Sequence, residues 1–147
     1  MDTKIRAHAV ARGVSNRITW RGACDQPEVI AAMRESDLFV LPSRVADDGD
    51  RDGLPNVLME AASQKLAILS TPVSAIPEFI ENGTHGLLST DEPETLAQAI
   101  ITFAADPALG PKLTQAAYDR LCQHFTMDPG ILHLHKRLSD MLAKSGS

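Results

Sequence analysis

The residues best suited by type and spacing to do chemistry lie in an acidic loop and in the helix predicted after it. Asp52 and Glu60 are acidic residues with seven residues between them. Pro55 is favoured at the first position of a helix, because the amide that proline lacks would have no partner there. The amides of residues 56–58 would then be free at the positive end of the helix dipole, which predicts a site for a phosphate group.

Glu60 is the only charged residue between positions 57 and 62 of this helix. Such a carboxylate is either exposed at an edge or half-buried and in need of hydrogen-bond donors. A ribose diol would supply two donors. A basic side chain such as Arg44 or Arg51 would also satisfy the carboxylate, so both interpretations stay open.

The elements that must position these residues follow an α/β pattern. Three short apolar runs are predicted strands: Ile18–Trp20, Leu38–Leu41 and Ala67–Leu69. Helical sequence follows each run, over residues 25–35, 55–64 and 76–81. The alternation predicts a Rossmann-like parallel sheet with flanking helices. The second run is apolar throughout, which is typical of a strand covered on both faces, and we expect Trp20 and Phe39 in the core.

The flanking sequence is helical. An Ala-rich helix is predicted over residues 2–12, with Gly13 as its C-terminal cap, so the domain begins with a helix and is expected to be clipped of its first strand. After the segment Leu87–Leu88, residues 91–94 resemble a capping box before a further helix. More helices follow Asp106 and residues 128–130, giving a helical C-terminus. We expect one domain over residues 1–144 and a flexible tail over 145–147.

Composition limits the class of protein. The 147 residues carry 14 basic and 19 acidic side chains, a net charge of −5, which argues against nucleic acid as a partner. No apolar run approaches the roughly 20 residues that span a bilayer, so we expect a cytoplasmic protein. Cys24 and Cys122 lack metal-binding spacing, and both are expected to be free, mostly buried thiols.

Ligands of an open parallel sheet bind beyond the carboxyl ends of its strands. Here that edge is predicted to hold the loops over residues 22–26, 42–54 and 71–76.

Residues 52–60, with the sequence DGLPNVLME, resemble the paired acidic motif of retaining GT-B glycosyltransferases of family 4, also called group 1. Residues 16–22, 36–43 and 71–88 resemble other stretches of this family, in the same order and over nearly the whole chain. The resemblance implies the C-terminal, donor-binding half of a GT-B fold. It also implies an enzyme that transfers a sugar with retention from a nucleotide-diphosphate sugar, in polysaccharide or glycolipid synthesis.

The resemblance assigns roles by position. It implies that Glu60 holds the ribose hydroxyls and that Asp52, where the family usually has glutamate, is the catalytic-site acid beside the donor sugar. The base would meet the backbone of Gly22, Ala23 and Cys24. The diphosphate would lie along Gly53, Leu54, Pro55, Asn56 and Val57. The nucleotide-diphosphate sugar is the expected substrate, and no metal cofactor is expected.

Two parts of the family pattern have no match in this sequence. The family's acceptor domain supplies a histidine, and its first donor-domain loop supplies an arginine and a lysine for the diphosphate. Because stabilisation of leaving-group charge is a large catalytic contribution, we expect the chain alone to be inactive or nearly so, and to need an acceptor domain or partner chain. The alternative is a non-catalytic binding module derived from the same domain. The missing strand would leave an open sheet edge, which a homodimer could cover.

Two other patterns compete with these assignments. Asp48, Asp50 and Asp52 precede Gly53 as in a calcium loop, but the closing glutamate is missing because position 59 is methionine. The basic last helix, which carries His133 and His135, could dock on the inner membrane face; a solvated outer face is the competing interpretation.

Overall fold

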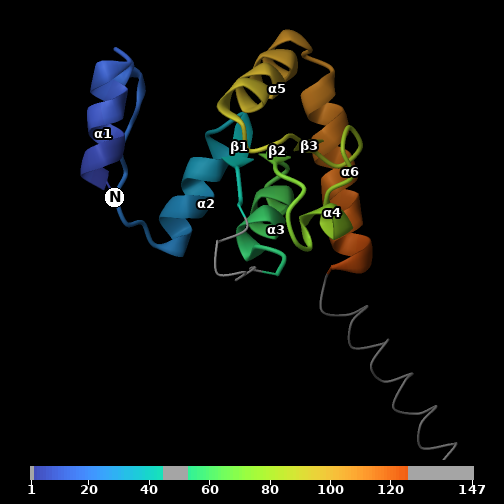
Figure 1. The fold of residues 1–147 in the computed structure, drawn as a ribbon. Coiled ribbons are helices and arrows are strands. Elements are labelled where there is room, and N and C mark those ends of the chain that lie inside the picture. The colour runs from blue at the N-terminus through green and yellow to red at the C-terminus, as the bar shows by residue number, and fades with distance from the viewer. Residues whose placement is uncertain (1, 45–52, 126–147) are drawn as a thin grey trace, which may run out of the picture.

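The computed structural model describes residues 2–44 and 53–125 (Figure 1). The predicted last helix, the tail 145–147, the calcium-like pattern and Asp52 lie outside these residues. In chain order the elements are α1 (Asp2–Ala11), the 3-10 turn η1 (Ser15–Arg17), α2 (Gln26–Arg34), β1 (Leu38–Leu41), α3 (Asn56–Ser63), β2 (Ala67–Ser70), α4 (Ile76–Phe79), β3 (Leu87–Leu88), α5 (Pro93–Ala105) and α6 (Leu109–His124).

The sheet confirms the predicted α/β class. Its described strands are parallel and lie in the order β1–β2–β3, with Leu38 opposite Ala67 and Leu69 opposite Leu87. All four residues of the central strand β2 are buried. Helices flank the sheet, and after β3 the described chain consists of the two helices α5 and α6 (Figure 1).

The core lies where β2 packs against α3 and α6. Its largest members are fully buried: Phe79, Leu58, Ile68, Ile76 and Ile80. Small side chains on α3, Ala61 and Ala62, are also fully buried and allow the helix to lie close to its neighbours. This packing fixes α3, the helix that carries Glu60.

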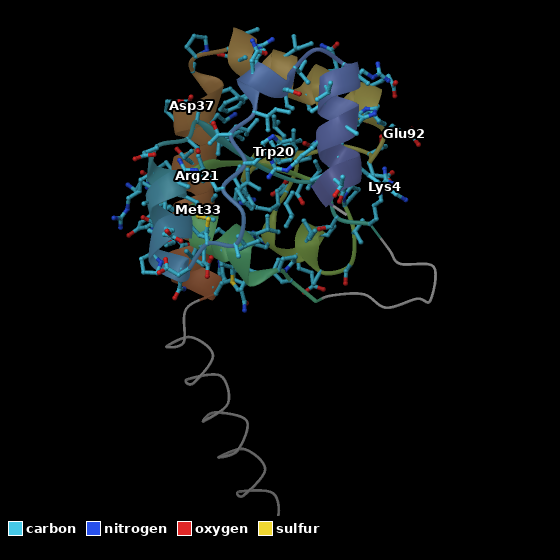
Figure 2. All side chains as sticks on the ribbon, turned by 90° about the vertical axis from the view of Figure 1, so that its left-hand side faces the viewer. Lys4, Trp20, Arg21, Met33, Asp37 and Glu92 are labelled. Carbon is cyan, nitrogen blue, oxygen red and sulfur yellow. The ribbon has the colours of Figure 1, made fainter. Side chains whose placement is uncertain are left out.

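The strand predicted over Ile18–Trp20 does not form. Ile18 is extended, with φ −117° and ψ 124°, yet no described segment pairs with it. A strand requires a partner for its backbone groups, and β1 pairs only with β2 among the described strands. Trp20 is half-buried beside α1, where the Arg6 guanidinium lies 4.8 Å from its ring centroid (Figure 2).

The prediction that β1 is covered on both faces is also wrong. Val40 is 38% exposed, and Phe39 is only half-buried. α1, with its exposed Ile5 and Val10, lies to one side of the sheet (Figure 1). One edge of β1 is therefore unpaired by any strand that the structure describes.

Helix boundaries follow the local sequence closely. Asp25 caps α2 in a capping box with Glu28, and Gly13 has φ 67° just after α1, as expected for a helix C-terminus. Glu92 caps α5 without a side-chain hydrogen bond, so the predicted capping box is absent there. No helix in the described ranges is long and apolar enough to cross a bilayer.

Neither cysteine forms a disulfide, so both are thiols as predicted, but they are not buried. Cys24 is half-buried in the coil before α2, and Cys122 is exposed on α6.

His85 packs in the turn between α4 and β3, beside α6. Its Nδ1 accepts a 3.4 Å hydrogen bond from the Glu81 amide. Arg120, whose charge acts on His85, donates to the Glu78 carbonyl at 2.7 Å. Burial of the imidazole and the Arg120 charge lower the pKa of His85 below 6.5, and the Glu81 carboxylate opposes them. The folded state therefore binds this proton less readily than the unfolded state.

Stability is predicted to fall on acidification partly through His85. Well above about pH 6.5 the imidazole is neutral in both states. As the pH falls through about 6.5, the unfolded state gains the proton first, so the free energy of unfolding decreases. His85→Gln should reduce this slope between about pH 7 and about pH 5.5, measured by chemical denaturation. Equal slopes for His85→Gln and wild type would contradict the prediction.

Candidate functional site

The carboxyl ends of β1 and β2 are locked together by two side-chain hydroxyls. Ser70 Oγ donates to the Leu41 carbonyl at 2.7 Å, and Thr71 Oγ1 donates to the Ser43 carbonyl at 2.6 Å. Both hydroxyl residues are buried, so each bond satisfies polar groups that water does not reach. The two loops that leave this edge therefore start from fixed positions.

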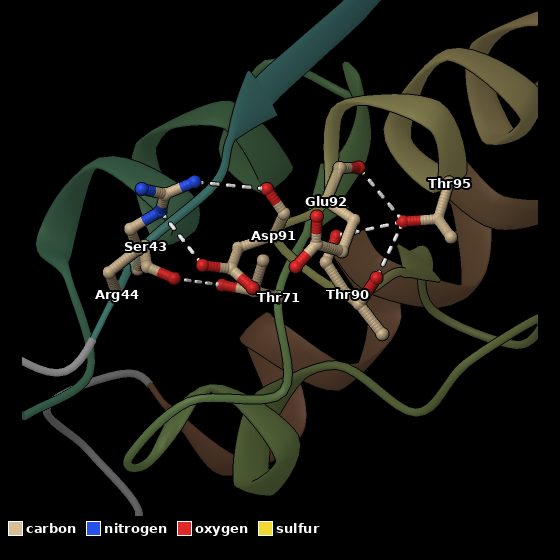
Figure 3. A network of polar contacts seen from close by, with 7 residues as sticks. All are labelled: Ser43, Arg44, Thr71, Thr90, Asp91, Glu92 and Thr95. Carbon is tan, nitrogen blue, oxygen red and sulfur yellow. Dashed lines mark hydrogen bonds and ion pairs between the residues drawn. The ribbon is translucent and has the colours of Figure 1, made fainter.

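A cavity of about 510 Å³ opens at this edge. Its lining residues are Ser43, Arg44, Thr71, Pro72, Val73, Thr90 and Asp91. Arg44 Nε lies 2.8 Å from Asp91 Oδ2, and Arg44 Nη2 donates to the Asp91 carbonyl at 3.2 Å (Figure 3). Beside them, Thr95 Oγ1 donates to the Glu92 carbonyl at 2.9 Å at the start of α5. Arg44 is thus engaged with the segment after β3 and not with Glu60, while Arg51 lies outside the described ranges.

Glu60 is half-buried in the middle of α3. Its Oε1 accepts a 3.2 Å hydrogen bond from Nε2 of Gln26, the first residue of α2. The coil that leads into α2 contains Gly22, which has φ 72°, and Ala23, both exposed, followed by half-buried Cys24. The structure therefore brings the predicted ribose carboxylate to the start of α2, two residues after the predicted base loop 22–24.

The start of α3 differs in one detail from the prediction. Pro55 has φ −63° and ψ 123°, so it is the N-terminal cap and not the first helical residue. Its carbonyl accepts the Leu58 amide at 3.0 Å, which removes one of the three amides expected to be free. Because proline offers no capping side chain, the amides of Asn56 and Val57 are the ones placed for an anion.

The residues before the helix contribute backbone to this region. Gly53 is exposed, whereas the side chains of Leu54 and Val57 pack against the core. Asp52 lies outside the described residues, so the pairing of the two acids stays a prediction. In the described ranges no group of three or more histidine, cysteine or acidic side chains is arranged to hold a metal. The acidic residues of the loop 47–52 lie outside the described ranges, so the metal-free expectation also stays a prediction.

Sequence reasoning missed Gln26 and the Arg44–Asp91 pair as parts of this edge. Gln26 follows a capping residue, a position that many residue types occupy, and nothing in its neighbourhood indicates a partner 34 residues away. Arg44 and Asp91 are 47 residues apart, and only the sheet brings them together. A pattern of charges along the sequence could not have paired them.

Known proteins resemble the chain in sequence. A family model described as "Glycosyl transferases group 1" matches residues 1–106. The amylovoran biosynthesis glycosyltransferase AmsK of Erwinia amylovora is 44% identical over 75 residues, which are 51% of this chain and 18% of that protein. The lipopolysaccharide core biosynthesis mannosyltransferase LpcC of Rhizobium leguminosarum bv. viciae is 29% identical over 126 residues, 85% of this chain and 34% of that protein. The chain therefore spans between 18% and 34% of the length of these relatives.

Solved structures resemble it in fold. The sucrose-phosphate synthase of Thermosynechococcus elongatus has a TM-score of 0.79 at 20% identity, with 97% of this chain and 34% of that chain covered. Anabaena Alr3699/HepE in complex with UDP has a TM-score of 0.76 at 21% identity, with 97% and 36% covered. These likenesses confirm the Rossmann-like, GT-B-type arrangement of the sheet and its helices.

The hydroxyl of Thr71 is predicted to stabilise this edge. Thr71→Val keeps the shape of the side chain but leaves the Ser43 carbonyl without its donor, which should cost about 1–2 kcal/mol of unfolding free energy. Thr114→Val, whose hydroxyl donates to Pro111 in the same helix near the surface, should cost less. Urea denaturation measures both, and equal losses would count against a special role for the β1–β2 lock.

Proposed function

The chain belongs to the group 1 glycosyltransferase family, and we propose that it binds the nucleotide-diphosphate sugar donor of a retaining, family 4 enzyme. The observation that carries the proposal is the position of Glu60, half-buried on α3 and hydrogen-bonded across to the start of α2. A carboxylate held there contacts the helix that follows the loop 22–24, and it belongs to the helix whose first amides are placed for an anion.

Each part of the donor has a chemically suited partner in this arrangement. Glu60 would accept hydrogen bonds from the two ribose hydroxyls, and the backbone of residues 22–24 would bind the base. The amides at the start of α3 and its dipole would hold the diphosphate without a metal ion. Asp52 would contact the donor sugar near the reacting carbon. That last role rests on the sequence motif alone.

The comparisons support this ligand class. Alr3699/HepE has been solved with UDP, with UDP and glucose, and with UDP-glucose, so that protein binds a nucleotide sugar. The names of AmsK and of WcaL of Salmonella typhimurium, 42% identical over 79 residues, place them in amylovoran and, putatively, colanic acid biosynthesis. We therefore propose a bacterial polysaccharide or lipopolysaccharide as the product class for the whole enzyme. Its place of action is proposed to be the cytoplasm, at the inner membrane face where a lipid-linked acceptor would lie.

Donor binding and sugar transfer are proposed to be separable in this chain. The family's acceptor-domain histidine and its basic pair for the leaving diphosphate have no match in the sequence, and without them the leaving group's charge is not offset. An acceptor-binding domain would supply the histidine, and a donor-domain loop outside this sequence or a partner chain would supply the basic pair.

Nucleotide binding tests the proposal directly. UDP, GDP and ADP are titrated into the folded chain and followed by NMR and thermal shift. One of them should stabilise the chain by about 2.7 kcal/mol when present at 100 times its dissociation constant. Glu60→Ala should weaken binding at least about tenfold, because the ribose loses its acceptor. Glu94→Ala, on exposed α5, serves as the matched control and should bind like wild type.

Two outcomes would contradict this function. If none of the three nucleotides binds to the folded chain, donor binding is refuted and a non-catalytic interaction module becomes the better explanation. If the purified chain transfers sugar from the bound donor to an acceptor, the separation of binding from transfer is refuted instead.

One observation favours that second candidate, a binding module. β1 is paired on one side only among the described strands, and its outer residue Val40 is exposed. An unpaired apolar edge is a template for a further strand, and a second copy of the chain offers one.

Self-association through β1 predicts a dimer whose population rises with concentration in light scattering. Val40→Lys places a charge on the edge strand and should shift the equilibrium towards monomer. Ile101→Lys makes the same change at a side chain of α5 that is 60% exposed and not part of the strand, and it should not. A wild-type chain that stays monomeric at high concentration would refute the dimer.

A further inference from the structure

The hydrogen bond between Gln26 and Glu60 joins two segments that the proposed function uses separately. Gln26 Nε2 donates to Glu60 Oε1 at 3.2 Å, from the first residue of α2 to the middle of α3. α2 is the helix that the base loop enters, and α3 is the helix that begins at the proposed diphosphate site. The bond is therefore the side-chain link between the base end and the ribose end of the site.

Both partners are presented from backbones that the fold holds firmly. At Gln26 the chain is fixed by the capping box, in which Asp25 Oδ1 accepts the Glu28 amide and Glu28 Oε2 accepts the Asp25 amide, each at 2.9 Å. Pro27 adds a fixed φ in the first turn of α2. Glu60 sits between the fully buried Leu58 and Ala61. With both backbones held, only the side-chain rotamers of Gln26 and Glu60 can vary, and the hydrogen bond between them restricts both rotamers.

The side-chain amide of Gln26 is a suitable hydrogen-bond donor for a carboxylate that must stay charged. A glutamine amide is neutral, so it orients the carboxylate without forming an ion pair that would compete with incoming hydroxyls. It occupies one oxygen, Oε1, and within the described residues no other side chain donates to this carboxylate. The second oxygen, Oε2, is left to accept from a ligand.

We propose that Gln26 is a positioning residue, which holds Glu60 in the rotamer that receives the ribose hydroxyls. The inference rests on the proposed function, because it concerns the same nucleotide. Without Gln26 the Glu60 side chain would have to be ordered by the ligand itself. Binding of a nucleotide with ribose hydroxyls should then weaken about three- to tenfold, the cost of immobilising one such side chain.

The test compares two ligands and two variants. Calorimetry measures the dissociation constants of the preferred nucleoside diphosphate and of its 2′,3′-dideoxy analogue, which lacks both ribose hydroxyls. Gln26→Met keeps the length of the side chain and the helix propensity but removes the amide. It should weaken binding of the normal nucleotide about three- to tenfold and leave the dideoxy analogue unchanged. In a Glu60→Ala background, Gln26→Met should have no further effect on either ligand.

The control for general damage is Gln115→Met, which removes a glutamine that hydrogen-bonds to Lys65 and Asp119 and should leave both ligands unaffected. Equal weakening of both ligands by Gln26→Met would show a merely structural role and overturn the inference. Unchanged binding of both ligands would overturn it too, while leaving the proposed function standing if Glu60→Ala still loses affinity. If the wild-type chain binds no nucleoside diphosphate, the proposed function and this inference fail together.

Discussion

The packing of α3 on the central strand is the interaction on which the rest of the structure depends. β2 is buried along its whole length, and Leu58, Ala61 and Ala62 bury the apolar face of α3 completely. A helix held on that face can present only its opposite side and its first turn to a ligand. Glu60 lies between buried neighbours and the Asn56 amide lies at the helix start, so the core positions both parts of the candidate site.

The elements that were predictable are those whose causes are local. The α3 and β2 segments are apolar at the right period, and Asp25 with Glu28 signals the start of α2 within four residues of sequence. Ile18–Trp20 has equally good strand composition, yet it stays an unpaired extended segment. Strand formation depends on a neighbour that no local pattern can supply, and among the described strands the sheet ends at β1.

The residues of the candidate site also divide into those that the sequence could predict and those that it could not. Glu60 and the start of α3 could be chosen from spacing and from one family motif, because a helix start and an isolated carboxylate are visible in sequence. The partner of Glu60 could not, since Gln26 meets it only after α2 packs beside α3. Arg44 was a reasonable partner for Glu60 by charge, but the ends of β1 and β3 bring it to Asp91 instead.

The net charge of the chain works against binding of the proposed ligand. The chain carries a net charge of −5, and the proposed ligand is itself an anion, so the average field of the protein opposes binding. At physiological ionic strength that repulsion is screened within about 8 Å, whereas helix amides and their dipole act at contact distance. Arg44 is already neutralised by Asp91, and Glu60 is oriented by an uncharged amide. A site of this kind gains affinity from fixed hydrogen bonds more than from net charge. Its affinity therefore depends on how firmly α2 and α3 hold the groups that form those bonds.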